Sequence, residues 1–188
     1  MSGDWILDSP YPSVNFLNTL RDRYLGGWEL LTTPELLGEW LVAAKLTDRA
    51  PELTPARLAE AVALREAMDA VLMAVGRRER PSAKAVHMLN ATATSAPRAV
   101  LQLRLPSRGL PESCQVLPGD PAAAALATLA ADAIERVAER ACVRQCAAED
   151  CSIRYVDLSP ARNKQWCSMA RCGNRMKSRN HYRRVTAH

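Results

Sequence analysis

The sequence has few of the residues on which enzymes most often depend. Its 188 residues contain only three histidines, and two of them, His181 and His188, lie in the last eight positions. The glycine-rich phosphate loop and the Gly-x-Ser-x-Gly nucleophile motif are both absent from the sequence. No histidine cluster is available for general acid–base chemistry. We therefore expect a protein that is not an enzyme.

Long apolar runs are also missing. The alanine-rich segment that begins at Pro121 is broken by Asp132 and Glu135, well short of the roughly 20 apolar residues that span a bilayer. The first twelve residues contain acids and prolines, whereas a secretory signal has a basic start and then an apolar run. We therefore expect a cytoplasmic protein without a membrane contact. In a reducing cytoplasm, six cysteines are more typical of metal or redox chemistry than of disulfides.

A helix-start pattern recurs along the first 145 residues. Thr33-Pro34, Thr54-Pro55 and Asp120-Pro121 each place a capping residue before a proline, and apolar residues at helical spacing follow. The helix from Thr54-Pro55 should end near Gly76, and the helix from Asp120-Pro121 should run nearly into a cluster of cysteines. Further helices are expected over residues 13–24 and 82–94.

The remaining part of this region is a predicted hairpin. Between residues 98 and 117, apolar and polar residues alternate and are followed by a Pro-Gly turn signal. The fold class is therefore mainly α, with a helical N-terminal domain, residues 1–143, that contains a small β-hairpin. Cys114 lies in this hairpin, and we expect it to be buried. Asn18 and Arg21 could line a pocket for a small-molecule effector, although such residues often make only caps and surface contacts.

Four cysteines form two pairs with the same internal spacing. Four residues separate Cys146 from Cys151 and four separate Cys167 from Cys172, with fifteen residues between the pairs. Such pairs are typical of a structural zinc site, in which four thiolates close a tetrahedral shell. We therefore predict one structural zinc ion per chain. Chance spacing is the alternative, and Cys142 could substitute in the ligand set.

The residues between the two pairs indicate the local fold of this zinc site. Residues 153–157 are strand-like, and Ser168 is a helix cap that places Cys172 in the first turns of a helix. The order of knuckle, strand and helix predicts a treble-clef-like four-cysteine zinc finger over residues 144–188. So short a segment seldom buries enough apolar surface to fold alone, so the metal would supply much of its order.

The charge is concentrated at the C-terminal end. Residues 151–188 hold nine lysines or arginines and one acid, Asp157, although the net charge of the whole chain is +5. This asymmetry favours a nucleic-acid contact at one end of the molecule. The candidate contact residues are Arg162, Lys164, Arg171, Arg175, Lys177, Arg179, His181, Arg183 and Arg184. We expect double-stranded DNA as the partner, because arginine binds phosphate and guanine in a bidentate manner.

Other interpretations of this basic segment remain open. It could be a solvated tail, or the zinc module could dock an acidic protein partner. RNA is a third target, because composition does not distinguish A-form from B-form helices. A palindromic operator would require a homodimer, and no sequence feature identifies its surface.

The C-terminal residues resemble a known family. The two cysteine pairs, the stretch Asp157-Leu158-Ser159-Pro160-Ala161-Arg162-Asn163 and the tetrapeptide Cys172-Gly173-Asn174-Arg175 are similar to the CGNR zinc finger of bacterial transcription regulators. Upstream, residues 16–20, the Thr33-Pro34-Glu35 helix start and residues 64–67 resemble the helical ABATE domain that usually precedes this finger. The resemblance implies four cysteine ligands, close packing at Gly173, and Asn174 and Arg175 as residues that orient the helix or reach a phosphate. It also implies a regulator whose helical domain receives a signal.

Overall fold

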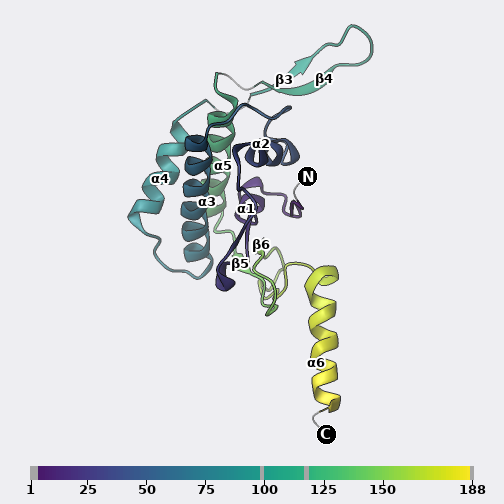
Figure 1. The fold of residues 1–188 in the computed structure, drawn as a ribbon. Coiled ribbons are helices and arrows are strands. Elements are labelled where there is room, and N and C mark those ends of the chain that lie inside the picture. The colour runs from purple at the N-terminus through teal and green to yellow at the C-terminus, as the bar shows by residue number, and fades with distance from the viewer. Residues whose placement is uncertain (1–3, 98–99, 117–118, 187–188) are drawn as a thin grey trace.

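The computed structural model describes residues 4–97, 100–116 and 119–186, and Figure 1 shows their arrangement. The α-helices of this part of the chain are α1 (Pro12–Leu17), α2 (Pro34–Ala43), α3 (Pro55–Gly76), α4 (Ala83–Thr94), α5 (Pro121–Ala138) and α6 (Asn174–Thr186). Its strands pair antiparallel as β1 (Leu20–Arg21) with β2 (Trp28–Glu29), β3 (Val100–Arg104) with β4 (Glu112–Val116), and β5 (Val143–Gln145) with β6 (Arg154–Val156). The chain is thus mainly helical, as the sequence predicted.

The hydrophobic core lies where α3 packs against α1, α4 and α5. Phe16, Trp40 and Leu129 are fully buried there, and the ring centroids of Phe16 and Trp40 are 4.7 Å apart. Large aromatic side chains contribute much of the apolar area that a small core buries. The helical part of the chain therefore has a hydrophobic core of its own.

Side-chain caps begin the longer helices of this region. Thr33, Thr54, Ser82 and Asp120 cap α2, α3, α4 and α5, each with a side-chain oxygen that accepts a backbone N–H of the first turn. The N–H of Ala122 donates to Asp120 Oδ1 at 2.9 Å. Each cap satisfies a donor that has no partner within its helix. The predicted helix starts at these residues are confirmed.

Arg65 is the charged residue with the lowest exposed fraction among the described residues. Arg65 is 1% exposed, and its two terminal nitrogens donate to the two carboxylate oxygens of Glu29 at 2.8 and 2.6 Å. It also donates to Thr19 Oγ1 at 3.0 Å. Burial raises the pKa of Glu29, but the hydrogen bonds from Arg65 and from the backbone outweigh it and hold this pKa below its ordinary value. The ion pair therefore joins β2 to the middle of α3 and stabilises their contact.

The first helix is shorter than predicted. It was expected over residues 13–24, but α1 ends at Leu17. Asn18 leaves the helix with its side chain bonded to the backbone of Arg154, and Asp22 has φ +48°, which an α-helix excludes. The chain instead forms β1, a short 3₁₀ turn and β2. Tertiary contacts thus override the local helical pattern.

The helix from Pro121 is also shorter than predicted. It ends at Ala138, and the N–H of Ala141 closes its last turn on the carbonyl of Arg136 at 2.9 Å. Arg140 takes the left-handed conformation, with φ +53°, that commonly follows such an end. The segment before the cysteines is the strand β5, which the sequence analysis missed. No helix of the described residues is both long and apolar enough to cross a membrane.

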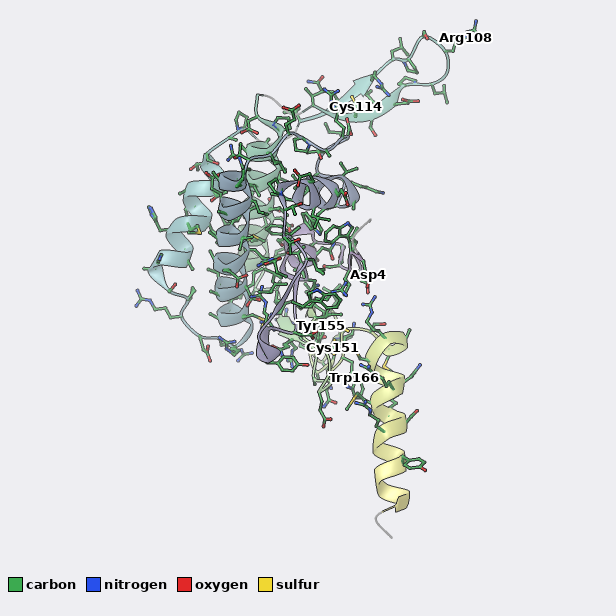
Figure 2. The ribbon with its side chains drawn as sticks, viewed as in Figure 1. Asp4, Arg108, Cys114, Cys151, Tyr155 and Trp166 are labelled. Carbon is green, nitrogen blue, oxygen red and sulfur yellow. The ribbon has the colours of Figure 1, made fainter. Side chains whose placement is uncertain are left out.

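The predicted hairpin is present as β3 and β4, and it projects from one end of the helical part (Figure 1). All five residues of β3 are exposed. Cys114, which is labelled on this hairpin in Figure 2, was predicted to be buried but is only half-buried. The prediction was wrong because the hairpin stands away from the helical core.

Candidate metal centre and nucleic-acid interface

The first cysteine pair lies in the turn that joins β5 to β6. The N–H of Cys146 donates to the carbonyl of Ile153 at 2.9 Å, which extends the β5–β6 ladder. The N–H of Cys151 donates to the carbonyl of Ala148 at 3.0 Å and closes the turn. Both cysteines are buried. This turn is the first knuckle of a treble-clef-like finger.

The second cysteine pair lies at the start of the C-terminal helix. Ser168 caps a π-helical turn, Met169–Gly173, that leads directly into α6. The hydroxyl oxygen of Ser168 accepts the N–H of Arg171 at 3.3 Å, and its carbonyl accepts the N–H of Cys172 at 3.0 Å. Cys167 directly precedes this cap, and Cys172 lies within the capped turn. The predicted order of knuckle, strand and helix is confirmed.

The four cysteine sulfur atoms lie close together. The Sγ atoms of Cys146, Cys151, Cys167 and Cys172 all lie within 4.8 Å of one another. Cys167 Sγ is 3.9 Å from Cys151 Sγ and 3.7 Å from Cys172 Sγ. A tetrahedral zinc ion with Zn–S bonds of about 2.3 Å requires sulfurs about 3.8 Å apart. The four thiols therefore form a metal site whose size and donor set fit zinc, with no position left for water or substrate.

Without a cation, the thiolate forms of Cys151 and Cys172 are disfavoured. Contact with the thiol of Cys167, together with burial, holds the pKa of Cys151 far above its ordinary value. Burial, followed by contact with Cys151, raises the pKa of Cys172 to about 11. A bound divalent cation reverses this preference, because it coordinates and stabilises the thiolates. Metal binding at this site should therefore release protons and weaken as the pH falls.

The alternative ligand Cys142 lies outside the cluster that the structure assembles. Its Sγ accepts the Nε–H of Arg144 at 3.2 Å, and its carbonyl accepts the N–H of Asp157 at 2.8 Å. Cys142 thus supports the base of the β5–β6 hairpin.

Apolar side chains pack around the metal site and the base of α6. Trp166 packs against the cysteine cluster, and Met176, in the first turn of α6, is 7% exposed. A Cβ atom on Gly173 would lie 2.5 Å from Sδ of Met169 and 3.4 Å from the ring of Trp166. Glycine therefore lets the π-helical turn pack closely on these two side chains.

Two family models match the chain. The ABATE model, described as "Putative stress-induced transcription regulator", matches residues 11–140, which is more than half of the chain. The chain belongs to the ABATE family. The model of the CGNR zinc finger matches residues 143–185, so the resemblance inferred from the sequence is confirmed for both parts. A search of curated proteins finds no match.

Three of the predicted contact residues of the CGNR finger form ion pairs. Arg171 Nη1 lies 2.7 Å from a carboxylate oxygen of Asp8, in the segment before α1. Arg175 and Arg179 lie 2.8 and 3.5 Å from the two carboxylate oxygens of Asp150. All of these side chains are at least 40% exposed, and such surface pairs contribute only about 0–1 kcal/mol. A polyanion could therefore displace the two aspartates.

The other predicted contact residues lie on α6 and on the loop that follows β6. Asn174 and Lys177 are exposed on α6, and Arg162 is exposed in the loop. Lys164 is also exposed, with its ammonium nitrogen 5.3 Å from the ring centroid of Tyr155. The side chains of His181, Arg183 and Arg184 lie outside the described part of the structure. The structure thus places these residues on two surfaces, the helix and the loop.

A buried set of hydrogen bonds joins the finger to the ABATE domain. The side-chain amide of Asn18 accepts the backbone N–H of Arg154 at 2.8 Å and donates to its carbonyl at 3.0 Å. The Arg154 guanidinium donates to both carboxylate oxygens of Asp69 on α3, at 2.7 and 3.1 Å. Asn18, predicted as a pocket residue, binds the finger backbone and also lines a cavity of about 150 Å³ between the two parts of the chain. Sequence reasoning missed Asp69 and Arg154, because neither belongs to a motif.

The end of α3 also lies directly against the finger. A Cβ atom on Gly76 would overlap the backbone carbonyl of Val143 in β5, so only glycine allows this approach. Elsewhere, a cavity of about 350 Å³ opens between the two parts of the chain, and Arg21, Trp28 and Arg171 are among its lining residues. The second predicted pocket residue, Arg21, therefore faces a cavity shared by the ABATE domain and the finger.

Proposed function

We propose that this protein is a zinc-dependent, DNA-binding transcription regulator of the bacterial cytoplasm. In this proposal, the four cysteines bind one structural zinc ion per chain. Helix α6 and the loop after β6 contact double-stranded DNA. The observation that carries it is the position of α6, which projects from the rest of the molecule (Figure 1) and contains basic residues but no acid.

The geometry of α6 supports a contact with a nucleic-acid groove. A helix of 13 residues is about 20 Å long, and the major groove of B-form DNA admits a helix of this kind. The base of the helix packs on the finger, where Met176 and the preceding Cys172 are buried, whereas Arg175, Lys177 and Arg179 are exposed. Loss of the metal would therefore release the helix from the orientation in which it presents its cations.

The cavity between the ABATE domain and the finger supports a small-molecule effector as a further part of the proposal. Its volume of about 350 Å³ lies at the lower end of the range for ligand pockets. Arg21 comes from the ABATE domain and Arg171 from the finger. An effector bound there would contact both parts and could bias the position of the finger.

A titration of duplex DNA with the zinc-loaded protein tests the DNA contact. Fluorescence anisotropy at several salt concentrations gives the slope of log K against log salt, which measures the number of phosphates neutralised. Lys177→Ala with Arg179→Ala should reduce this slope by about 1.8, since each lost phosphate contact accounts for about 0.9. The matched control is Arg80→Ala with Arg108→Ala, which removes two exposed arginines outside the finger.

Three results would contradict this proposal. Duplex binding with no salt dependence would exclude the phosphate contact. Preference for RNA in a competition with DNA would assign the finger to another nucleic acid. Equal loss of binding in the test and control variants would mean that only the overall charge of the protein attracts DNA.

A further inference from the structure

The zinc site of the proposed function gathers more negative charge than the metal neutralises. Four thiolates bind one divalent ion, which leaves an excess of about two negative charges. Cys146, Cys151 and Cys172 are buried, so solvent reaches their sulfur atoms poorly. A buried charge is costly unless hydrogen-bond donors stabilise it. The ligand sulfurs therefore need N–H groups from the surrounding finger.

Such donors reach two of the ligand sulfurs. The backbone N–H of Cys167 donates to Sγ of Cys146 at 3.4 Å. The guanidinium of Arg175 donates through Nη2 to Sγ of Cys172 at 3.6 Å. Hydrogen bonds in which the donor is charged are roughly twice as strong as neutral ones. Arg175 therefore supplies the site with a strong donor and with a positive charge.

The spacing of residues along the chain explains the contact of Arg175 with the sulfur. Cys172 lies in the π-helical turn, and Arg175 follows three positions later in α6. Residues three apart on a helix are neighbours on one face, and long helical side chains lean toward the N-terminal end of the helix. The Arg175 side chain therefore leans back over Cys172. Met176, the next residue, is buried in the finger and holds this end of α6 in place.

The same nitrogen of Arg175 also contacts the turn that holds the first cysteine pair. It lies 2.8 Å from Oδ1 of Asp150, which directly precedes Cys151 in the chain. Cys151 is labelled in Figure 2 beside the base of α6, and its Sγ lies within 4.8 Å of the sulfur of Cys172. One guanidinium thus joins the first turn of the finger to the ligand at the start of the helix. This link keeps the two cysteine pairs at the separation that one metal ion requires.

A contact with nucleic acid is the alternative role of Arg175. Arg175 and Arg179 have side chains that are 43% and 47% exposed, and both pair with Asp150. An exposed ion pair contributes little by itself, so the pair with Asp150 does not separate the two arginines. Among the contacts of the described residues, the hydrogen bond to a ligand sulfur distinguishes Arg175 from Arg179.

We propose that Arg175 is a positioning residue of the zinc site, which donates a hydrogen bond to the thiolate of Cys172 and links this ligand to Asp150. Groups that hydrogen-bond to metal ligands orient the ligands and tune the metal. The proposal gives the last residue of the tetrapeptide Cys172-Gly173-Asn174-Arg175 a role at the metal. It rests on the zinc site of the proposed function and is independent of DNA binding.

The zinc affinity of the full chain, measured without DNA by competition with a chromophoric chelator, tests the proposal. Arg175→Ala should weaken zinc binding about 10- to 100-fold, because it removes a hydrogen bond to a ligand. Arg175→Lys should restore only part of this loss, since an ammonium group lacks the planar fork of the guanidinium. Asp150→Asn removes only an exposed ion pair and should weaken binding less than about five-fold.

Cobalt(II) in place of zinc gives a second measurement that a general loss of stability would not reproduce. A hydrogen bond to a thiolate stabilises the sulfur electrons and raises the energy of the sulfur-to-cobalt charge-transfer band. Arg175→Ala should therefore shift this band to longer wavelength, whereas Asp150→Asn should leave it nearly unchanged.

The matched control is Arg144→Ala. Arg144 also donates to a cysteine sulfur, that of Cys142 at 3.2 Å, but Cys142 lies outside the metal cluster. The Arg144 side chain is 42% exposed, which is close to the value for Arg175. This control should keep the cobalt band of the wild type and a zinc affinity within about five-fold of it.

Several results would overturn the proposal. Arg175→Ala might keep the zinc affinity and the cobalt band of the wild type, or Arg144→Ala could lose as much affinity as Arg175→Ala. Full recovery of both measurements by Arg175→Lys would show that a positive charge alone is sufficient. A wild type that binds no zinc would refute the zinc site of the proposed function together with this inference. Weak DNA binding by a protein whose zinc and cobalt results are as expected would refute only the DNA contact.

Discussion

The ABATE domain and the CGNR finger are ordered by different forces. In the ABATE domain, α1, α2, α3 and α5 bury large apolar side chains such as Phe16 and Trp40. Half of the buried residues in the cluster of the finger are cysteines, and the others are Ala148, Tyr155 and Met176. A segment of that size buries too little apolar surface to fold alone. A bound zinc ion would therefore stabilise the finger as the hydrophobic core stabilises the ABATE domain.

Removal of the metal should produce the largest difference in stability between the two regions. Cys167→Ser should lower the zinc content from one ion per chain to nearly none and unfold residues 143–186, because a structural zinc ion supplies about 10–16 kcal/mol of binding free energy. The thermal transition of the ABATE domain should persist. Metal analysis by mass spectrometry and limited proteolysis measure both effects. Cys114→Ser, which removes a thiol outside the cluster, is the control; loss of the whole fold in Cys167→Ser would refute the comparison.

A core substitution should have the converse effect. Trp40→Ala should lower the free energy of unfolding of the ABATE domain by about 3–5 kcal/mol, because it leaves a large cavity. Urea denaturation followed by circular dichroism measures this loss. The finger should keep its zinc in the absence of urea. Trp28→Ala changes a side chain that is 59% exposed and should cost far less; equal costs for the two tryptophans would contradict the assignment of the core.

The contact between the two regions can be weakened without altering either interior. Arg154→Ala leaves the carboxylate of Asp69 without its bidentate partner, and breaking a buried ion pair costs about 3 kcal/mol. We expect faster hydrogen exchange at β6 and at the end of α3, with zinc retained. Arg104→Ala breaks an exposed pair and should cost less than about 1 kcal/mol. An unchanged exchange rate at β6 in the Arg154 variant would show that the finger is held by other contacts.

The smallest expected effect is a pH dependence confined to the ABATE domain. Because the folded-state pKa of Glu29 lies below its ordinary value of 4.5, the unfolded chain takes up a proton first as the pH falls. The stabilisation is therefore complete above this ordinary value and is lost as the pH drops toward the folded-state pKa. Glu29→Gln should flatten this part of the stability curve, measured by denaturation between pH 3 and pH 7, a range chosen around the carboxyl pKa.

The matched control for Glu29 is Glu112→Gln. Glu112 also pairs with an arginine, but its side chain is 57% exposed, so solvent screens the interaction. Its substitution should leave the curve nearly unchanged. A Glu29 variant with the same acid sensitivity as the wild type would show that other groups cause the loss of stability.

Local signals in the sequence were sufficient for much of the fold. The caps at Thr33, Thr54, Ser82 and Asp120 act within one helical turn, so their effect is readable from neighbouring residues. The cysteine spacing was equally informative, because tetrahedral coordination imposes strict geometry on any chain that supplies four thiolates. These features gave the helix starts, the hairpin and the composition of the metal cluster.

Other features depend on residues far apart in the chain. The early end of α1 follows from the bond between Asn18 and Arg154, which lie 136 positions apart. The strand β5 is only three residues long and exists through its pairing with β6. No local window contains both Asn18 and Arg154, and a strand of three residues is too short to give a clear periodic pattern, so local patterns favoured a longer helix in both places.

The sequence alone was enough to identify the cysteines of the metal site, the start of most helices and the basic end of the chain. The folded chain alone shows that Arg154 binds Asp69, that Arg171 and Arg175 pair with Asp8 and Asp150, and that β3 is exposed along its whole length. The physical reason is the range of the interactions. Capping and chelation by a short segment are local, whereas ion pairs and apolar packing are fixed only when the whole chain has folded around them.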